Sequence, residues 1–171
     1  MDKPKIIILT DRNSRYIDKM TDWMYELWGK EEGCSKKEVE NYIKKCISSK
    51  KIPQTIIATI DKEIVGMCNL LMHDHDSKPD IYPWLGNLFV DKDYRNQGIS
   101  KMLINKAIKQ SKKLNLKELY LYTKHIGLYE KFNFKFIEDI KTAKPNTAND
   151  RLYKLDLIDY HIDALWPICY N

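Results

Sequence analysis

The stretch that most constrains the fold of this sequence is a strand-like run followed by a polar turn and a helical pattern. The apolar run at residues 84–90 leads into the polar residues 91–98, and apolar residues then recur at helical spacing over residues 98–112. A second apolar run follows at residues 118–123. Two strands that flank one helix predict a β-α-β unit with parallel strands and a right-handed crossover.

The polar turn at residues 91–100 also predicts a binding site for an anion. The first turn of a helix has backbone N–H groups without intrahelical partners, and it carries the positive end of the helix dipole. Gly98 lets the backbone come close to a ligand. We therefore expect a negatively charged group such as a phosphate at the start of the 98–112 helix.

The rest of the sequence predicts further strands and helices around this unit. Apolar spacing predicts helices at residues 14–28 and 35–49, and Ser35 with Glu38 forms the pattern of a capping box. Gly86, inside a predicted strand, indicates a bulge or a close backbone approach. Additional strands are predicted at residues 5–10, 54–60, 63–72, 134–140 and 151–157, with a two-residue hairpin turn at 61–62.

The length of 171 residues suits one domain, which we expect to span residues 1–171. Residues 158–171 would form a C-terminal tail that packs on this domain or on a partner. The four cysteines are not at metal-ligand spacing, and no apolar run approaches the roughly 20 residues of a membrane span. No apolar segment typical of a signal peptide occurs, so we expect a cytoplasmic protein with reduced thiols and no membrane partner.

The charge distribution argues against a nucleic-acid partner. The net charge of +5 is mild and suits a ligand with several phosphates at least as well as a nucleic acid. The lysines are scattered over predicted helix surfaces. A nucleic-acid binder would cluster them with exposed aromatic residues on one face. We therefore expect a small-molecule or peptide partner.

Two motifs within residues 84–136 resemble the GCN5-related N-acetyltransferase (GNAT) superfamily. Residues 95–100 read RNQGIS, which is similar to the acetyl-CoA motif of that family: Gln or Arg, two residues, Gly, one residue, then Gly or Ala. Residues 127–134 read GLYEKFNF, which is similar to its later Tyr-x-x-x-Gly-Phe segment. Ser100 and Asn133 depart from these patterns, but serine is small and asparagine tolerates the left-handed conformation.

The resemblance implies an α/β fold with a twisted, mostly antiparallel sheet, one central parallel strand pair and helices on both faces. It implies acetyl-CoA as co-substrate. His73 and His75 could form a metal pair, but no third ligand stands at a defined spacing, so we expect no metal. The backbone at the start of the helix would hold the pyrophosphate, and the pantetheine arm would pair with the end of the preceding strand, where the two parallel strands splay apart. The cofactor-binding residues implied are Leu88, Phe89, Val90, Arg95, Asn96, Gln97, Gly98, Ile99 and Ser100.

Acetyl transfer to an amine needs a proton acceptor for the amine and a proton donor for the leaving thiolate. Tyr129 falls where the family places its general-acid tyrosine, and a phenol is protonated at neutral pH. The strand at residues 84–90 lacks the glutamate that many members use as a base. Asp74 and Asp80, in the polar loop before it, are the alternatives as base or as contacts for the substrate ammonium. A solvated turn is the competing interpretation of that loop.

The acceptor itself is not identified by the sequence. Trp28, His73 and Trp84 are predicted to contact it, and the acidic loop suits a cationic amine such as an aminoglycoside, a polyamine or a peptide N-terminus. The leading hypothesis is an N-acetyltransferase that moves acetyl from acetyl-CoA to a primary amine of a small molecule or peptide, by direct attack in a ternary complex. The alternative is a non-catalytic acetyl-CoA-binding sensor or partner protein. The apolar tail and the habits of the family admit a homodimer.

Overall fold

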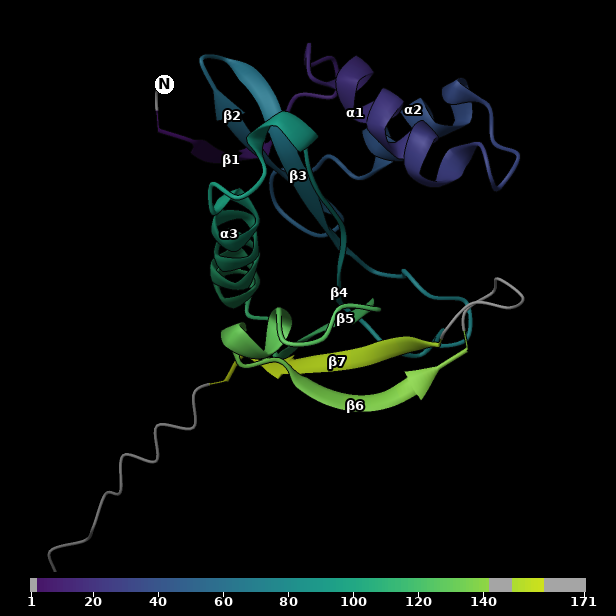
Figure 1. Ribbon diagram of the computed structural model, residues 1–171, viewed down its shortest axis with the longest axis vertical. Coiled ribbons are helices and arrows are strands. Elements are labelled where there is room, and N and C mark those ends of the chain that lie inside the picture. Colours follow the sequence, from purple (N-terminus) through teal and green to yellow (C-terminus); the bar gives the residue numbers. More distant parts are fainter. Residues whose placement is uncertain (1–2, 142–148, 159–171) are drawn as a thin grey trace, which may run out of the picture.

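The computed structural model describes residues 3–141 and 149–158, and seven strands of these residues form one sheet. The strand order is β1-β2-β3-β4-β5-β7-β6 (Figure 1). The pair β4–β5 is parallel and the other neighbouring pairs are antiparallel, as predicted. The strands are β1 Lys5–Leu9, β2 Gln54–Ile60, β3 Glu63–Leu71, β4 Trp84–Val90, β5 Glu118–Thr123, β6 Lys135–Ile140 and β7 Asp150–Asp156.

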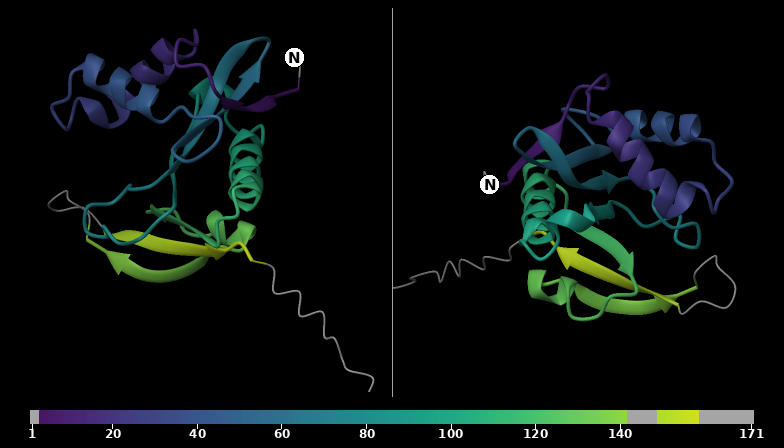
Figure 2. Two further views of the ribbon diagram at one scale, coloured as in Figure 1. Left: turned by 180° about the vertical axis from the view of Figure 1, so that it is seen from behind. Right: turned by 45° about the horizontal axis from the view of Figure 1, so that its top comes forward.

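Helices cover both faces of this sheet, as the fold prediction expected (Figures 1 and 2). Because successive strand residues point to opposite faces, Ile56 packs with α3 whereas Ile57 packs with α1 and α2. The helices are α1 Ile17–Met24, α2 Lys36–Lys45 and α3 Ile99–Lys113, with the short turns η1 Tyr25–Gly29, η2 Lys92–Tyr94 and η3 Tyr129–Phe132.

Two local sequence signals are confirmed at atomic detail. The backbone N–H of Glu38 donates to Ser35 Oγ at 3.2 Å, and the N–H of Ser35 donates to Glu38 Oε2 at 2.7 Å, so the predicted capping box starts α2. Asp61 and Lys62 have φ angles of 49° and 67°. Two successive left-handed residues form the tight turn that matches the twist of the β2–β3 hairpin.

The first predicted helix is regular only in part. The apolar spacing predicted one helix over residues 14–28, whereas α1 ends at Met24 and continues as the π-helical turn η1, in which the N–H of Lys30 donates to the Tyr25 carbonyl at 3.0 Å. At the end of η1, a Cβ on Gly29 would lie 2.9 Å from Val39 Cγ2, so η1 packs tightly on α2. Apolar periodicity alone does not distinguish a wide turn from a regular one.

Parts of the predictions lie outside the described residues. Most of the polar loop at residues 141–150 and the tail from residue 159 on belong to these parts, and the packing of the tail stays a prediction. Among the described helices, none has both the length and the apolar character that a membrane span requires.

Candidate functional site

The parallel strands β4 and β5 separate soon after they pair. Their register contains one pair, Trp84 with Tyr120, and the N–H of Tyr120 donates to the Pro83 carbonyl at 2.9 Å. Beyond that point, Gly86, Phe89 and Val90 of β4 pair with β3, and none of residues 86–90 pairs with β5 in the described sheet. The edge of β4 that faces β5 therefore keeps backbone groups available for a ligand.

β4 carries a bulge at the start of this open edge. Gly86 opposes Asn69 and Phe89 opposes Met67, so two residues of β4 face the single residue Cys68. Asn87, one of these two, has a φ of 53°, in the left-handed region that asparagine tolerates. The bulge predicted from Gly86 is confirmed, and it re-aims the neighbouring backbone groups of β4.

The loop after β4 turns into α3 through two left-handed residues. Asn96 has a φ of 62° and Gly98, the N-cap of α3, has a φ of 75°. Among the described residues, no backbone hydrogen bond is donated by the N–H groups of residues 97–100. Unpartnered N–H groups at the positive end of a helix dipole favour an anion, so the geometry is compatible with the anion site predicted from the sequence, which stays a prediction.

Arg95 is held against the end of β4. Its Nε donates to the Val90 carbonyl at 3.1 Å, and its guanidinium carbon lies 5.9 Å from the ring centroid of Phe89. The side chain is exposed, and its two terminal nitrogens remain available to an anion at the start of α3.

Tyr129 begins η3, on the same face of the sheet as α3, and is 8% exposed. Burial, with a smaller contribution from the nearby Cys68 thiol, raises the pKa of Tyr129 to about 12. Its ring stands edge-on to Phe134, with centroids 6.0 Å apart, after a turn in which Asn133 has the predicted left-handed conformation with a φ of 66°. The phenol is thus protonated at neutral pH and able to donate a proton.

Asp74 lies against the bulge of β4 from the other face. A Cβ on Gly86 would come within 2.5 Å of Asp74 Oδ2, so the glycine makes room for the carboxylate. Burial raises the pKa of Asp74 from its ordinary 3.8 to about 7. No ion pair joins Asp74 to another described residue. A carboxyl group that titrates near neutral pH suits proton transfer.

Aromatic side chains lie near Asp74. Burial raises the pKa of both Tyr42 and Tyr122, and the charge of Asp74 raises it further. Trp28, at the end of η1, stands edge-on to Tyr42 of α2, with ring centroids 5.8 Å apart, and Asn87 Nδ2 donates to Tyr42 Oη at 3.2 Å. His75 packs edge-on against Tyr122 of β5, with centroids 4.7 Å apart. Trp28 was predicted from the sequence to contact the acceptor, whereas the other aromatic residues here were not predicted. The polar Asn87 within an apolar strand was the one sequence signal for a polar contact in this region.

Three other predicted site residues are placed differently. His73 is exposed and makes no hydrogen bond to another described residue; its neighbour His75 faces the aromatic cluster instead. Asp80 is also exposed, with no hydrogen bond or ion pair to a described residue. Trp84 is 0% exposed, and its Nε1 donates to the Ile81 carbonyl at 2.7 Å. Direct contact of Trp84 with an acceptor is therefore not available, because the indole fills the core beneath Tyr120 and Tyr122.

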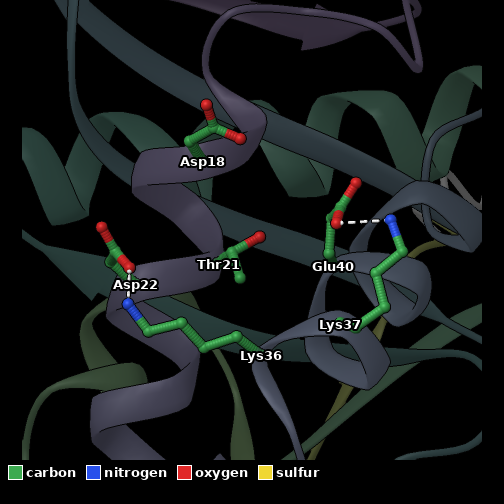
Figure 3. A pocket seen from close by; sticks show the side chains of 6 residues that line it. All are labelled: Asp18, Thr21, Asp22, Lys36, Lys37 and Glu40. Carbon is green, nitrogen blue, oxygen red and sulfur yellow. Dashed lines mark hydrogen bonds and ion pairs between the residues drawn. The ribbon is translucent and has the colours of Figure 1, made fainter.

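A separate groove lies between α1 and α2 (Figure 3). It has a volume of about 280 Å³. Lys36 pairs with Asp22 at 2.5 Å and Lys37 pairs with Glu40 at 2.9 Å, so much of its charge is already neutralised. Within the described residues, no group of three or more His, Cys, Asp or Glu side chains is arranged to hold a metal ion.

The family comparison agrees with this geometry. Residues 17–134 match the model of the acetyltransferase (GNAT) family, and the chain therefore belongs to this family. A search of curated proteins gives no significant match.

Solved acetyltransferase structures share the fold. A GNAT family acetyltransferase from Staphylococcus aureus Mu50 is 25% identical, with a TM-score of 0.61 over 91% of this chain and 100% of that one. One from Elizabethkingia anophelis, solved with acetyl-CoA bound, is 18% identical, with a TM-score of 0.64 over 91% and 99%. Aminoglycoside 6'-acetyltransferase type Ii is 20% identical, with a TM-score of 0.68 over 90% and 97%.

Proposed function

We propose that the protein is an N-acetyltransferase that moves acetyl from acetyl-CoA to a primary amine of a small molecule or peptide, by direct attack in a ternary complex. The observation that supports this proposal is that Asp74 and Tyr129, our candidates for the two proton-transfer roles, lie on opposite faces of the sheet near the gap between β4 and β5. Asp74 lies on the α1–α2 face and Tyr129 lies on the α3 face. An amine and a thioester that meet in the gap would each have one such group beside them.

The donor side of the gap suits coenzyme A. The free N–H groups of residues 97–100, together with Arg95 and Asn96, would bind the pyrophosphate. The unpaired edge of β4 at residues 88–90 would pair with the amide groups of the pantetheine arm. The solved relative from Elizabethkingia anophelis, which has acetyl-CoA bound, has the same fold and supports this assignment.

The proposed reaction proceeds with three proton transfers. The ammonium group of the acceptor loses a proton to Asp74, and the resulting neutral amine attacks the thioester carbonyl carbon. A C–N bond forms, and the C–S bond then breaks. Tyr129 donates its phenolic proton to the departing thiolate, which is possible because the high pKa keeps the phenol protonated at neutral pH. The nitrogen, which is positively charged after the attack, loses its second proton as the amide forms, and this proton restores the phenol of Tyr129.

Asp74 bears on the choice between an enzyme and a non-catalytic sensor. The sensor alternative rests on the absence of a glutamate from β4. Asp74 comes from the preceding loop, but its carboxylate lies against Gly86 of β4. A base can therefore be supplied to the strand from outside it, which favours the enzyme.

The test is the release of CoA thiol from acetyl-CoA in the presence of a panel of primary amines. We expect Tyr129→Phe to bind acetyl-CoA as the wild type does and to lose about a hundredfold or more in kcat, the usual contribution of a general acid. Tyr16→Phe is the matched control, because the Tyr16 hydroxyl makes no hydrogen bond to a described residue. An unchanged rate in Tyr129→Phe removes Tyr129 from the mechanism. Tight CoA binding without thiol release for any amine favours the sensor.

A further inference from the structure

A second buried carboxylate lies on the same face of the sheet as Asp74. Asp150, the first residue of β7, is 8% exposed and makes no hydrogen bond or ion pair through its side chain to another described residue. It pairs in register with Ile140, and Leu152, two residues on, pairs with Tyr122. Register partners and residues two apart share a face, so Asp150 points to the side of Tyr122.

Further carboxylates gather around Tyr122. Burial raises the pKa of this tyrosine most, and Asp74, Asp150, Glu32 and Asp76 raise it further, because each lies close enough to oppose a phenolate. These acids come from the α1–α2 loop, the β3–β4 loop and β7, so three segments converge on one ring. This local accumulation of negative charge stands against a net charge of +5 for the whole chain.

A cation beside the two most buried of these carboxylates, Asp150 and the half-buried Asp74, would stabilise their ionised forms. An ionised carboxylate that leaves water without a charged partner loses much of its solvation free energy. Asp74 contacts β4 and Asp150 belongs to β7, and β5 with Tyr122 lies between these strands. β4 and β7 lie two strand spacings apart, about 10 Å, and the gap between β4 and β5 widens this separation, so each carboxylate has room for an ammonium group of its own.

We propose that the acceptor carries at least two amino groups, of which one reacts beside Asp74 while another binds as an ammonium ion at Asp150. Asp76 and Glu32 extend this negative site. We call these four carboxylates, Glu32, Asp74, Asp76 and Asp150, the Tyr122 acidic cluster. The inference rests on the proposed function only in naming Asp74 as the place of the reacting amine. Linear polyamines and amino sugars share the required chemistry of several ammonium groups in one small molecule.

The experiment compares a diamine with a monoamine of the same length. Octamethylenediamine spans the separation when extended, and octylamine lacks only the second amino group. We expect kcat/KM to favour the diamine, and Asp150→Asn to lower the diamine-to-monoamine ratio about tenfold, the value of one charge-assisted contact. Asp139→Asn is the matched control, since it neutralises a neighbouring acid that alternates to the opposite face from the buried Ile140. It should leave the ratio unchanged.

Two kinetic results overturn the inference. One is a wild-type protein that uses both amines equally well. The other is an equal loss for both amines in Asp150→Asn, which would indicate a structural role for Asp150. A parallel series with spermidine and the amino sugar neamine then shows which kind of polyamine the site accepts.

A binding measurement separates this inference from the proposed function. Both amines are titrated calorimetrically into the CoA-loaded protein and its Asp150→Asn variant. Diamine binding that depends on Asp150 but gives no thiol release keeps the inference and overturns the proposed function. Thiol release with monoamines, without preferential binding of the diamine, keeps the proposed function and overturns the inference.

Discussion

At the scale of single residues, the burial of Asp74 has two opposite effects: it brings the pKa close to neutral, which suits proton transfer, and it destabilises the folded protein when the carboxylate is ionised. Its pKa is about 7 in the folded protein and 3.8 in an exposed chain, and burial is the cause. The folded state therefore binds this proton more tightly than the unfolded state does. The stabilisation from the neutral carboxyl is complete below pH of about 4 and is lost as the pH rises through about 7.

We predict that Asp74→Asn stabilises the protein at alkaline pH and inactivates it. At pH of about 8 the variant avoids a buried charge, so Tm should rise by about 2–4 °C, corresponding to about 1 kcal/mol. At pH of about 4 the two proteins should melt together. The wild-type kcat/KM should increase with pH up to about 7, the pKa of Asp74, and then level off, whereas the variant should show a low rate without this limb.

Asp80→Asn provides the comparison within the same loop. Asp80 was the other predicted base, but it is exposed, and neutralising it removes no buried charge. Its substitution should leave the free energy of unfolding within about 0.5 kcal/mol of the wild-type value. Loss of the acid limb in Asp80→Asn, with its retention in Asp74→Asn, would transfer the role of base to Asp80.

The sequence predicted some of these residues and not others for a physical reason. Tyr129 and Gly98 lie in short motifs, where local spacing determines their place. Tyr42 and Asp150 reach the site through long-range packing and strand register, which no window of sequence contains. Trp84 shows the opposite error: a tryptophan at the start of a strand suggested a ligand contact, but the neighbouring strands enclose it completely.

At the scale of elements, the start of α3 combines a left-handed turn with backbone N–H groups that have no partner. Asn96 and Gly98 are both left-handed, and the N–H groups that follow donate no backbone hydrogen bond within the described residues. Gly98 adopts this conformation without a steric cost, whereas other residues pay about 1–2 kcal/mol. The turn therefore depends on glycine for its shape and, through that shape, for the direction of its N–H groups.

We predict that Gly98→Ala weakens CoA binding about tenfold, because the strain tilts the turn and misdirects the N–H groups toward the pyrophosphate. Gly33→Ala is the matched control. Gly33 has a φ of 74° and open surroundings in the α1–α2 loop, so an alanine there would carry the same backbone strain as one at position 98. A CoA titration should show the loss in Gly98→Ala alone, while both variants should show a similar fall in Tm. Equal weakening of CoA binding in both would point to a global effect.

Elements were easier to predict than their irregularities. The hairpin of β2 and β3, the capping box of α2 and the strand β5 follow from local chemistry, and their observed bounds agree closely with the prediction. The π-helical turn η1 ends at Gly29, which packs closely on Val39 of another element. Packing between elements is not encoded in the periodicity of either one.

At the scale of the whole molecule, the open edge of β4 divides the sheet into two parts. β1–β4 form one part and β5, β7 and β6 form the other (Figure 2). The pair Trp84–Tyr120 joins the two parts in backbone register. Side-chain packing across α3, Tyr129 and Tyr153 completes the connection. A ligand in the gap would contact both parts, so its binding should stabilise the sheet as a whole.

We predict that CoA raises Tm and protects a defined set of amides from hydrogen exchange. Ligand at about 100 times Kd adds about 2.7 kcal/mol of stability, or about 5–10 °C in Tm for a chain of this size. Protection should increase most at residues 86–90 and 97–100, whose backbone groups lack partners on the gap side or at the helix start. The amides of the β2–β3 hairpin should change little, because they are already paired in the free protein. Uniform protection of both regions would mean that CoA acts by global stabilisation and would contradict binding in the gap.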